Sequence, residues 1–169
     1  MHQSRPGAEL LSALLTVVAL VAAPSFAWSQ QRAQLLPELR ADAIDVRSSR
    51  SGTLHAGVGL NLPLGYYVRL ETVGAGGVTR IDSSVVGSAR ADLVARFLLD
   101  PFGESRWGPS FGGGISARWA KTKGWHEYVV LVLDLEAPPA HGIVPAFQLG
   151  LGGGARLGLA LRRHQRGRR

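Results

Sequence analysis

The chain has 169 residues, no cysteine and a formal net charge of +7. The lack of cysteine excludes a disulfide framework and thiolate chemistry. Five of the positive charges are arginines in the last eight residues, 162–169, and residues 1–27 sum to zero, so residues 28–161 carry only +2. Because a nucleic-acid surface needs a basic face on the folded body, we expect no nucleic-acid partner.

The first 27 residues have the pattern of a secretory signal peptide. An apolar run from Leu10 to Ala23 is broken by Pro24. Ser25 and Ala27 then fit the small-residue positions of a cleavage site. The run is shorter than the roughly 20 apolar residues of a transmembrane helix, which is the alternative. We therefore predict export and a mature chain that begins near Trp28.

Apolar and polar residues alternate along the rest of the chain. In residues 87–100, one parity contains Leu93 and Phe97 and the other contains Arg90, Asp92 and Arg96. A period of two predicts β-strands, whose side chains alternate between two faces. The same alternation occurs in residues 52–62, 66–72, 110–121, 128–136 and 143–162. It is weaker in residues 38–48, where the phase slips near Ala43–Ile44, as a β-bulge would cause.

Turn-forming segments separate these strands, and we find no helical period after residue 31. Seven turns would join eight strands, an even number that suits a membrane barrel with both ends on one side. Whether glycines 152–154 form a hairpin turn or belong to one long strand is open. The sequence thus predicts an all-β fold, an eight-stranded antiparallel up-and-down barrel. The predicted turns are residues 47–53, 61–65, 74–84, 100–108, 121–127, 136–142 and 152–154.

Three features favour lipid on the outside of this barrel. The apolar face of each strand is nearly free of charge, over a length comparable with the 9–11 or so tilted residues that cross a bilayer. The polar face is rich in glycine and serine, which suit the narrow interior of eight strands. Aromatic residues gather beside the turns, as in the girdles of membrane barrels. They are Tyr66, Tyr67, Phe97, Phe102, Trp107 and Phe111 in one group, and Trp119, Trp125 and Tyr128 in the other.

The polar face also carries charges of both signs in nearly equal number. Since a desolvated charge costs several kcal/mol unless it is paired, we expect a paired network that plugs the lumen. The alternative is a set of ordinary ion pairs on the surface of a soluble sheet, each worth little. The predicted network consists of Arg40, Arg69, Arg90, Arg96, Arg118 and Arg156 with Asp42, Glu71, Asp92, Asp134 and Glu136.

The signal-like segment, the dyad repeats and the turn-flanking aromatics resemble those of the small eight-stranded outer-membrane barrels of the OmpA/OmpX type. The resemblance covers about residues 33–162 and implies a transmembrane barrel in the bacterial outer membrane, in contact with its lipid. Family members usually end on a C-terminal aromatic, whereas this chain ends its last predicted strand with LGLALRR. We divide the chain into a signal peptide (1–27), a lead-in (28–37), a barrel (38–162) and an Arg-rich tail (163–169).

No motif for catalysis, a cofactor or a metal stands out. The glycine runs lack the Lys-Ser/Thr of a phosphate loop, and the histidines His55, His126, His141 and His164 lack metal-ligand spacing. We predict a structural or interaction role without catalysis. Anionic phosphate groups are a candidate partner of the arginine tail, and the oligomeric state is open.

Two other functions remain open. One is a secreted, soluble, lipocalin-like barrel that binds a small apolar ligand in an apolar lumen. The other is an outer-membrane enzyme that modifies lipid A. For that enzyme, His126 and Glu127 in one predicted outer loop would have to meet Ser83 or Ser84 in another.

Overall fold

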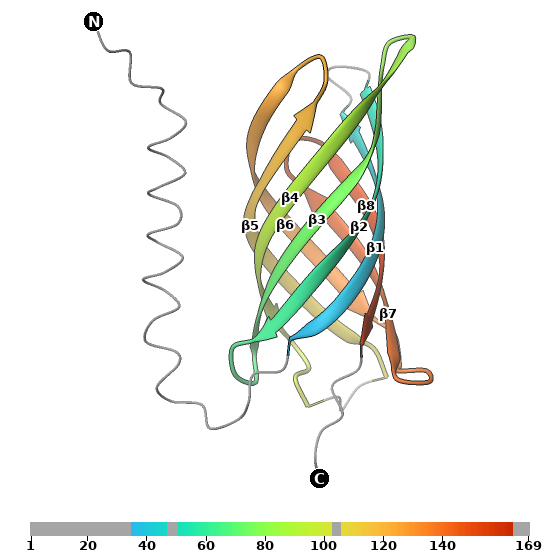
Figure 1. Cartoon of the computed structure of the whole chain (residues 1–169). Coiled ribbons are helices and arrows are strands. Elements are labelled where there is room, and N and C mark those ends of the chain that lie inside the picture. Colours follow the sequence, from blue (N-terminus) through green and yellow to red (C-terminus); the bar gives the residue numbers. More distant parts are fainter. Residues whose placement is uncertain (1–34, 47–50, 103–105, 164–169) are drawn as a thin grey trace, which may run out of the picture. The chain divides into compact units, whose positions relative to one another are not determined.

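The computed structural model describes residues 35–46, 51–102 and 106–163, in which eight antiparallel strands close into a barrel (Figure 1). Each strand pairs with its neighbours in chain order, and β1 pairs with β8. The strands are β1 (Leu36–Val46), β2 (Ser51–Pro63), β3 (Val68–Ile81), β4 (Ser84–Leu98), β5 (Gly108–Ala120), β6 (Gly124–Glu136), β7 (Ile143–Leu151) and β8 (Ala155–Arg163). The predicted all-β, eight-stranded, up-and-down barrel is confirmed.

The signal peptide predicted for residues 1–27 lies outside the described residues, as do most of the lead-in and most of the tail. No helix in the described part of the chain is long and apolar enough to cross a membrane.

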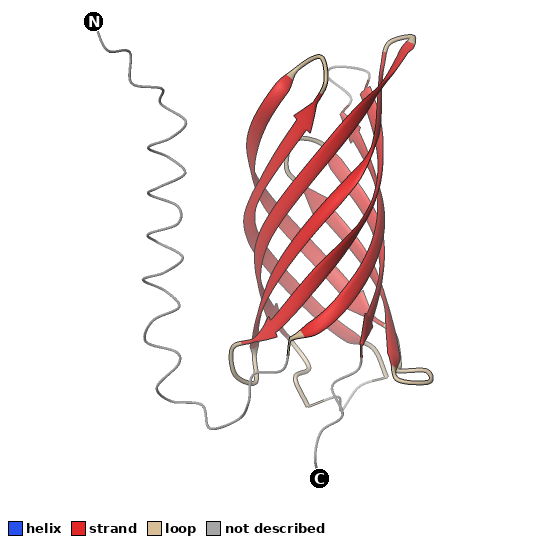
Figure 2. Ribbon diagram, viewed as in Figure 1, coloured by secondary structure: helices blue, strands red, loops and turns tan. Residues whose placement is uncertain are grey.

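The strands define two ends of the barrel (Figure 2). We call the end where β1 begins and β8 ends the terminal end; the β2–β3, β4–β5 and β6–β7 connections also lie there. The opposite end, which we call the far end, holds the β3–β4, β5–β6 and β7–β8 turns. Figure 1 shows that the β3–β4 hairpin extends furthest at the far end.

The bulge predicted near Ala43–Ile44 is wrong. β1 pairs residue by residue with β2, from Leu36 opposite Asn61 to Val46 opposite Ser51. The hydrophobic pattern breaks here because an apolar residue, Ile44, points inward and is buried, while the charged Asp45 is exposed. The backbone therefore keeps its register where the hydrophobic pattern breaks.

Two of the predicted turns overlap strands by four residues or more, and the predicted turns 47–53 and 61–65 each overlap β2 by three. β3 continues to Ile81, so the segment 74–84 contains only a short turn at Asp82–Ser83, and Asp82 adopts a φ of 52°. Aspartate tolerates this left-handed conformation better than most residues. The β5–β6 turn is limited to Lys121–Lys123, since β6 begins at Gly124. Glycines that read as turn formers thus lie inside paired strands.

Glycines 152–154 form the β7–β8 turn, which answers the question left open by the sequence. Their φ values of 143°, 62° and 130° lie in the left-handed half of backbone space, which other residues rarely adopt. A Cβ on Gly153 would lie 2.6 Å from the Tyr128 ring, so the turn packs closely against β6. β7 pairs with β6 only from Leu131 to Glu136, so residues 124–130 of β6 extend beyond the β7–β8 hairpin.

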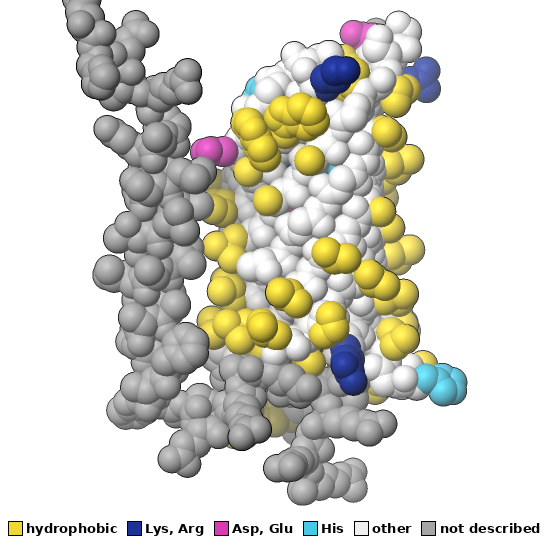
Figure 3. Space-filling view, viewed as in Figure 1, with side chains coloured by type: hydrophobic (Ala, Val, Ile, Leu, Met, Phe, Trp, Pro, Cys, Tyr) yellow, Lys and Arg dark blue, Asp and Glu magenta, His cyan; other side chains and the backbone are white. Residues whose placement is uncertain are grey.

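The outer wall of the barrel is apolar. Exposed large hydrophobic side chains occur on every strand, from Leu39 on β1 to Leu159 on β8. On the face drawn in Figure 3, hydrophobic side chains are spread along the wall, and the charged side chains lie near the two ends. The inner face carries most of the buried polar residues and a small apolar cluster of Val94, Val130 and Val132.

Glycines on the inner face let neighbouring strands approach closely. A Cβ on Gly114 of β5 would lie 1.9 Å from the carbonyl oxygen of Leu93 on β4, and one on Gly112 would lie 2.3 Å from that of Ala95. Real Cβ contacts are not this short. The tight curvature between β4 and β5 therefore depends on these positions lacking side chains.

We predict that Gly114→Ala lowers the free energy of unfolding by about 1–3 kcal/mol, because the added methyl must displace the β4 backbone. The matched control is Gly74→Ala on β3, where an added Cβ meets no atom within 4 Å. That change should alter stability by less than about 1 kcal/mol. Urea unfolding of the refolded chain measures both variants, and equal effects would contradict the close-approach argument.

Candidate functional site

Ten charged side chains are buried inside the barrel, each at most 5% exposed. They occupy inward positions of their strands, because alternate residues face the lumen. Eight belong to the predicted network, and Glu38 and Arg162 are additional. The remaining predicted members, Arg69, Arg118 and Glu136, are partly buried. The ten residues are Glu38, Arg40, Asp42, Glu71, Arg90, Asp92, Arg96, Asp134, Arg156 and Arg162.

Eight of the inward charges form a connected group near the terminal end, which we call the terminal-end cluster. Arg40 pairs with Glu38 at 2.6 Å and with Glu71 at 2.8 Å. Arg96 bridges Glu71 and Asp134. The full cluster is Glu38, Arg40, Arg69, Glu71, Arg96, Asp134, Glu136 and Arg162.

Arg162 has the most partners in the terminal-end cluster. Its Nε donates to Glu38 at 2.6 Å, and its Nη1 donates to Asp134 and, at 2.9 Å, to Glu136. Its Nη2 lies 3.5 Å from Glu71. Sequence analysis missed this role because Arg162 was grouped with the tail charges. The alternation of residues 143–161, continued by one step, would have assigned Arg162 to the inner face.

Four further charges form the central cluster, deeper in the barrel from the terminal end. Arg90 pairs with Asp42 at 2.6 Å and with Asp92 at 3.3 Å, and Arg156 pairs with Asp92 at 2.8 Å. Among the described residues, no ion pair joins this cluster to the terminal-end cluster. On β4, the buried Val94 lies between Asp92 of the central cluster and Arg96 of the terminal-end cluster, and it forms an apolar cluster with Val130 and Val132 of β6.

Each cluster is electrically neutral. The terminal-end cluster contains four arginines and four carboxylates, and the central cluster contains two of each. Because a buried charge without a partner costs several kcal/mol, neutrality at each level stabilises the narrow interior locally. All of these carboxylates except Asp42 pair with more than one arginine. Hydrogen bonds between ionised partners are stronger than those between neutral groups.

Arg118 is the exception among the inward arginines. It donates to the backbone carbonyl oxygens of Gly152 and, at 2.9 Å, of Gly153. Its guanidinium also lies 4.9 Å from the centre of the Tyr128 ring, a cation–π distance. No carboxylate of the described residues forms an ion pair with Arg118. Its positive charge is therefore held by dipoles and an aromatic face.

A second set of polar contacts lies between the central cluster and the far end. His55 Nε2 is 3.0 Å from the Ser88 hydroxyl, and His55 Nδ1 is 3.9 Å from Asp42. The Thr53 and Thr79 hydroxyls are 2.9 Å apart. No group of three or more His, Asp or Glu side chains in the described part of the chain is arranged to hold a metal ion.

The predicted loop carrying His126 and Glu127 is part of β6, so that placement is wrong. His126 is opposite Arg118, and Glu127 is opposite Ala117. The two side chains have opposite parity, so they point to opposite sides of the barrel wall. Ser83 lies in the β3–β4 turn, and Ser84 begins β4.

Aromatic side chains gather at both ends. Near the terminal end, Tyr67 stacks on Phe97 at 5.8 Å, and Phe97 contacts Phe111 at 5.6 Å. Trp119 and Trp125 are cross-strand neighbours beside the β5–β6 turn. Tyr128, which the sequence grouped with them, is half-buried and contacts the inward Arg118, so it does not belong to the outer girdle.

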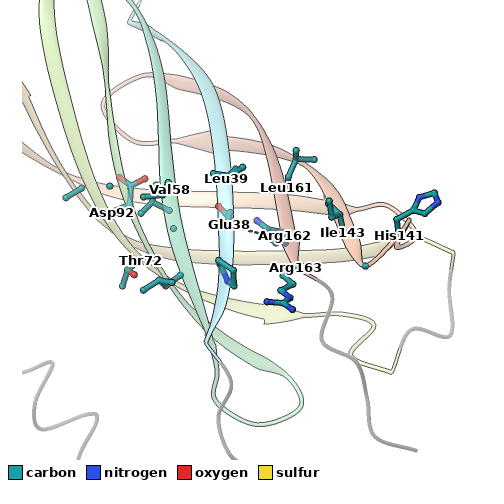
Figure 4. Close-up of a pocket in the computed structure, with 17 residues that line it drawn as sticks. Glu38, Leu39, Val58, Thr72, Asp92, His141, Ile143, Leu161, Arg162 and Arg163 are labelled. Atoms are coloured by element: carbon teal, nitrogen blue, oxygen red, sulfur yellow. Dashed lines mark hydrogen bonds and ion pairs between the residues drawn. The ribbon is translucent and has the colours of Figure 1, made fainter.

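A depression on the outer wall lies near the terminal end (Figure 4). Its lining includes the outward apolar residues Leu39, Val58 and Leu161. Glu38 and Arg162, which also line it, are bonded to each other. Most of its lining is apolar or glycine, and its other polar residues, Thr72, Asp92, His141 and Arg163, come from separate segments of the chain. The charged interior is therefore the main candidate site.

Comparison with protein-family models and with curated proteins finds no match for this chain.

We predict that Arg162→Ala destabilises the barrel by about 3–5 kcal/mol, because four carboxylates would lose a shared partner. Arg163→Ala is the matched control, since Arg163 is adjacent on β8 but exposed. It should change stability by less than about 0.5 kcal/mol. Equilibrium unfolding in urea gives both values. A small effect of Arg162→Ala would mean that the cluster does not depend on this residue.

Proposed function

We propose that the protein is a bacterial outer-membrane β-barrel with a structural or interaction role, without catalysis, whose lumen is plugged by charged side chains. The observation that carries the proposal is the distribution of side chains. Large apolar residues are exposed on every strand, and ten charged residues are buried inside. A protein in water would bury its large apolar side chains. A protein in lipid must instead keep its charged side chains inside, away from the hydrocarbon.

The extent of the apolar wall supports a lipid environment. Soluble monomers rarely expose contiguous apolar patches larger than a few hundred Å². Here Leu131 and Leu133 on β6 are 62% and 60% exposed, and Leu157 and Leu159 on β8 are similarly exposed. Transfer of such a wall from water to hydrocarbon is favourable at roughly 25 cal/mol per Å².

The backbone also suits a bilayer. Closure of the barrel pairs β1 with β8, so no sheet edge remains along the paired part of the wall. In hydrocarbon every backbone N–H and C=O needs an internal partner, and only helices and closed barrels provide this. The strands contain 9 to 15 residues, enough for the 9–11 or so that cross a bilayer at a tilt.

The location in the outer membrane rests on two features. The apolar segment 10–23 with small residues at Ser25 and Ala27 is typical of an exported chain. Transmembrane strands closed into a small barrel are the architecture of outer-membrane proteins of the OmpA/OmpX type. Separation of inner and outer membranes from the native host tests this location, and recovery in the soluble fraction would contradict it.

The two rival functions fit the geometry less well. A lipocalin-like barrel needs an apolar lumen, whereas the described inner face carries both charged clusters. For the lipid A-modifying enzyme, His126 and Glu127 point to opposite sides of the wall. No hydrogen bond within the described residues joins His126 to Ser83 or Ser84. We therefore favour a role without catalysis.

A charge on the outer wall tests the lipid contact. We predict that Leu131→Arg makes folding in lipid vesicles less favourable by about 2–4 kcal/mol, since Leu131 is well inside the span of β6. Val85→Arg is the matched control. Val85 is also exposed but lies beside the β3–β4 turn, where the cost should be about 0–1 kcal/mol. Equal costs, or none, would argue against a transmembrane wall.

Conductance tests the plug. Eight strands leave an interior only wide enough for side chains, and here those side chains are ion-paired. We predict that the purified protein gives no large, steady channel in planar bilayers. A stable porin-sized conductance from the unmodified protein would refute the plug.

Asp92→Ala removes a carboxylate shared by Arg90 and Arg156 and should lower the free energy of unfolding by about 3–5 kcal/mol.

A further inference from the structure

The far end of the barrel contains a small cavity above the central cluster, which we call the vestibule. Its volume is about 90 Å³, well above the roughly 10–15 Å³ that one water needs. Residues from β2, β3, β4, β5 and β6 line it, together with Gly153 of the β7–β8 turn. It is separate from both neutral clusters, whose charged residues are not part of its lining.

The lining of the vestibule carries positive charge and hydrogen-bond donors but no carboxylate. The cationic groups are Arg118 and Lys123. The ring of His126 lines the same space, directly opposite Arg118 in the β5–β6 pairing. Ser88, Thr79 and Tyr128 add hydroxyl groups. The lining thus offers many donors to a ligand that carries negative charge.

Arg118 is positioned to contribute to such a site. Two of its five N–H groups bond to the carbonyl oxygens of Gly152 and Gly153, which fix the side chain in place. Its Nε is buried and has no hydrogen-bond partner. Both neutral clusters use their carboxylates on other arginines, so the charge of Arg118 is not neutralised within the described residues. A partly buried cation of this kind is stabilised by an external anion.

The shape of the glycine turn maintains this arrangement. Because the three glycines have positive φ values, the chain turns back at the level of Tyr128 and presents two carbonyl oxygens to Arg118. A longer β7–β8 hairpin would continue alongside residues 124–130 of β6, which β7 leaves unpaired. Because the hairpin is short, the barrel wall beside the vestibule is shorter at β7 and β8 than at β6.

We propose that the vestibule binds a phosphate group. A phosphate carries close to two negative charges and three strong acceptor oxygens. These match the Arg118 guanidinium, the Lys123 ammonium and the surrounding hydroxyl and imidazole donors. Guanidinium and ammonium groups are the usual protein partners of phosphate. The phosphate is either free inorganic phosphate or the head group of a lipid phosphomonoester. The inference needs the barrel but not its location in a membrane.

Calorimetric titration of inorganic phosphate into the full-length chain in dodecyl maltoside tests the site, at constant ionic strength in a buffer without other oxyanions. Saturable binding to one site is expected. Arg118→Gln should weaken it at least tenfold. Arg80→Gln, an exposed arginine near the β3–β4 turn that does not line the vestibule, should change it less than twofold.

A second matched pair covers the case in which Arg118→Gln does not fold. Lys123 lines the vestibule and Lys121, two residues earlier in the same turn, does not. Lys123→Gln should weaken phosphate binding at least threefold, and Lys121→Gln should not. The absence of saturable binding, or equal losses within either pair, would overturn the proposal.

The source of the phosphate is distinguished in nanodiscs. The affinity for inorganic phosphate is compared between discs of phosphatidylcholine alone and discs that also contain one tenth phosphatidic acid. If a lipid head group occupies the vestibule, phosphatidic acid lowers the apparent affinity at least tenfold, and Arg118→Gln removes this competition. If affinity is unchanged, free phosphate is the ligand. Both outcomes support a phosphate site in the vestibule, and they differ only in whether the phosphate is free or belongs to a lipid.

Discussion

The pairing of charges in a space too narrow for bulk water is the constraint on which the rest of this barrel depends. Eight strands enclose a lumen that side chains fill, so a charge placed there cannot be hydrated. The chain meets this requirement level by level. Glu38, Glu71, Asp134 and Glu136 neutralise four arginines near the terminal end, and Asp42 and Asp92 neutralise two deeper in the barrel. Because each cluster is neutral by itself, its charges are compensated locally.

Small residues on the same face make the pairing possible. Gly112 and Gly114 allow β5 to approach β4 so closely that a Cβ would collide with its carbonyl oxygens. Arg96 is directly opposite Gly112, and a Cβ at that position would lie 3.1 Å from the Cγ of Arg96, so this long side chain uses the space that the glycine leaves. The alternation of very small and very long inward residues therefore fills a narrow interior without a conventional apolar core. Only a small valine cluster remains in it.

Much of the barrel could be predicted from the sequence, because a period of two fixes both the strands and the faces. The errors arose where residue type and backbone conformation disagree. An inward Ile44 followed by an outward Asp45 suggested a bulge, and the segment GAGG at 74–77 suggested a turn. Arg162 and Glu38 were missed because each lies at an edge of the predicted barrel, where the alternation has no continuation to support it. The partners of each charge depend on the tilt and stagger of the strands, which no local pattern contains.

The two ends of the barrel differ in electrostatic character for one physical reason. Near the terminal end every inward guanidinium has a carboxylate within reach, so the interior is saturated. Near the far end, β7 and β8 end at the glycine turn, before β6 does. The cavity there is lined by Arg118 and Lys123 and by no carboxylate of the described residues. Because the final hairpin is short, the donors of Arg118 and Lys123 face an accessible space. The charges deeper in the barrel form ion pairs with each other. The same fold thus contains paired charges in its middle and, at its far end, a cavity lined by Arg118 and Lys123.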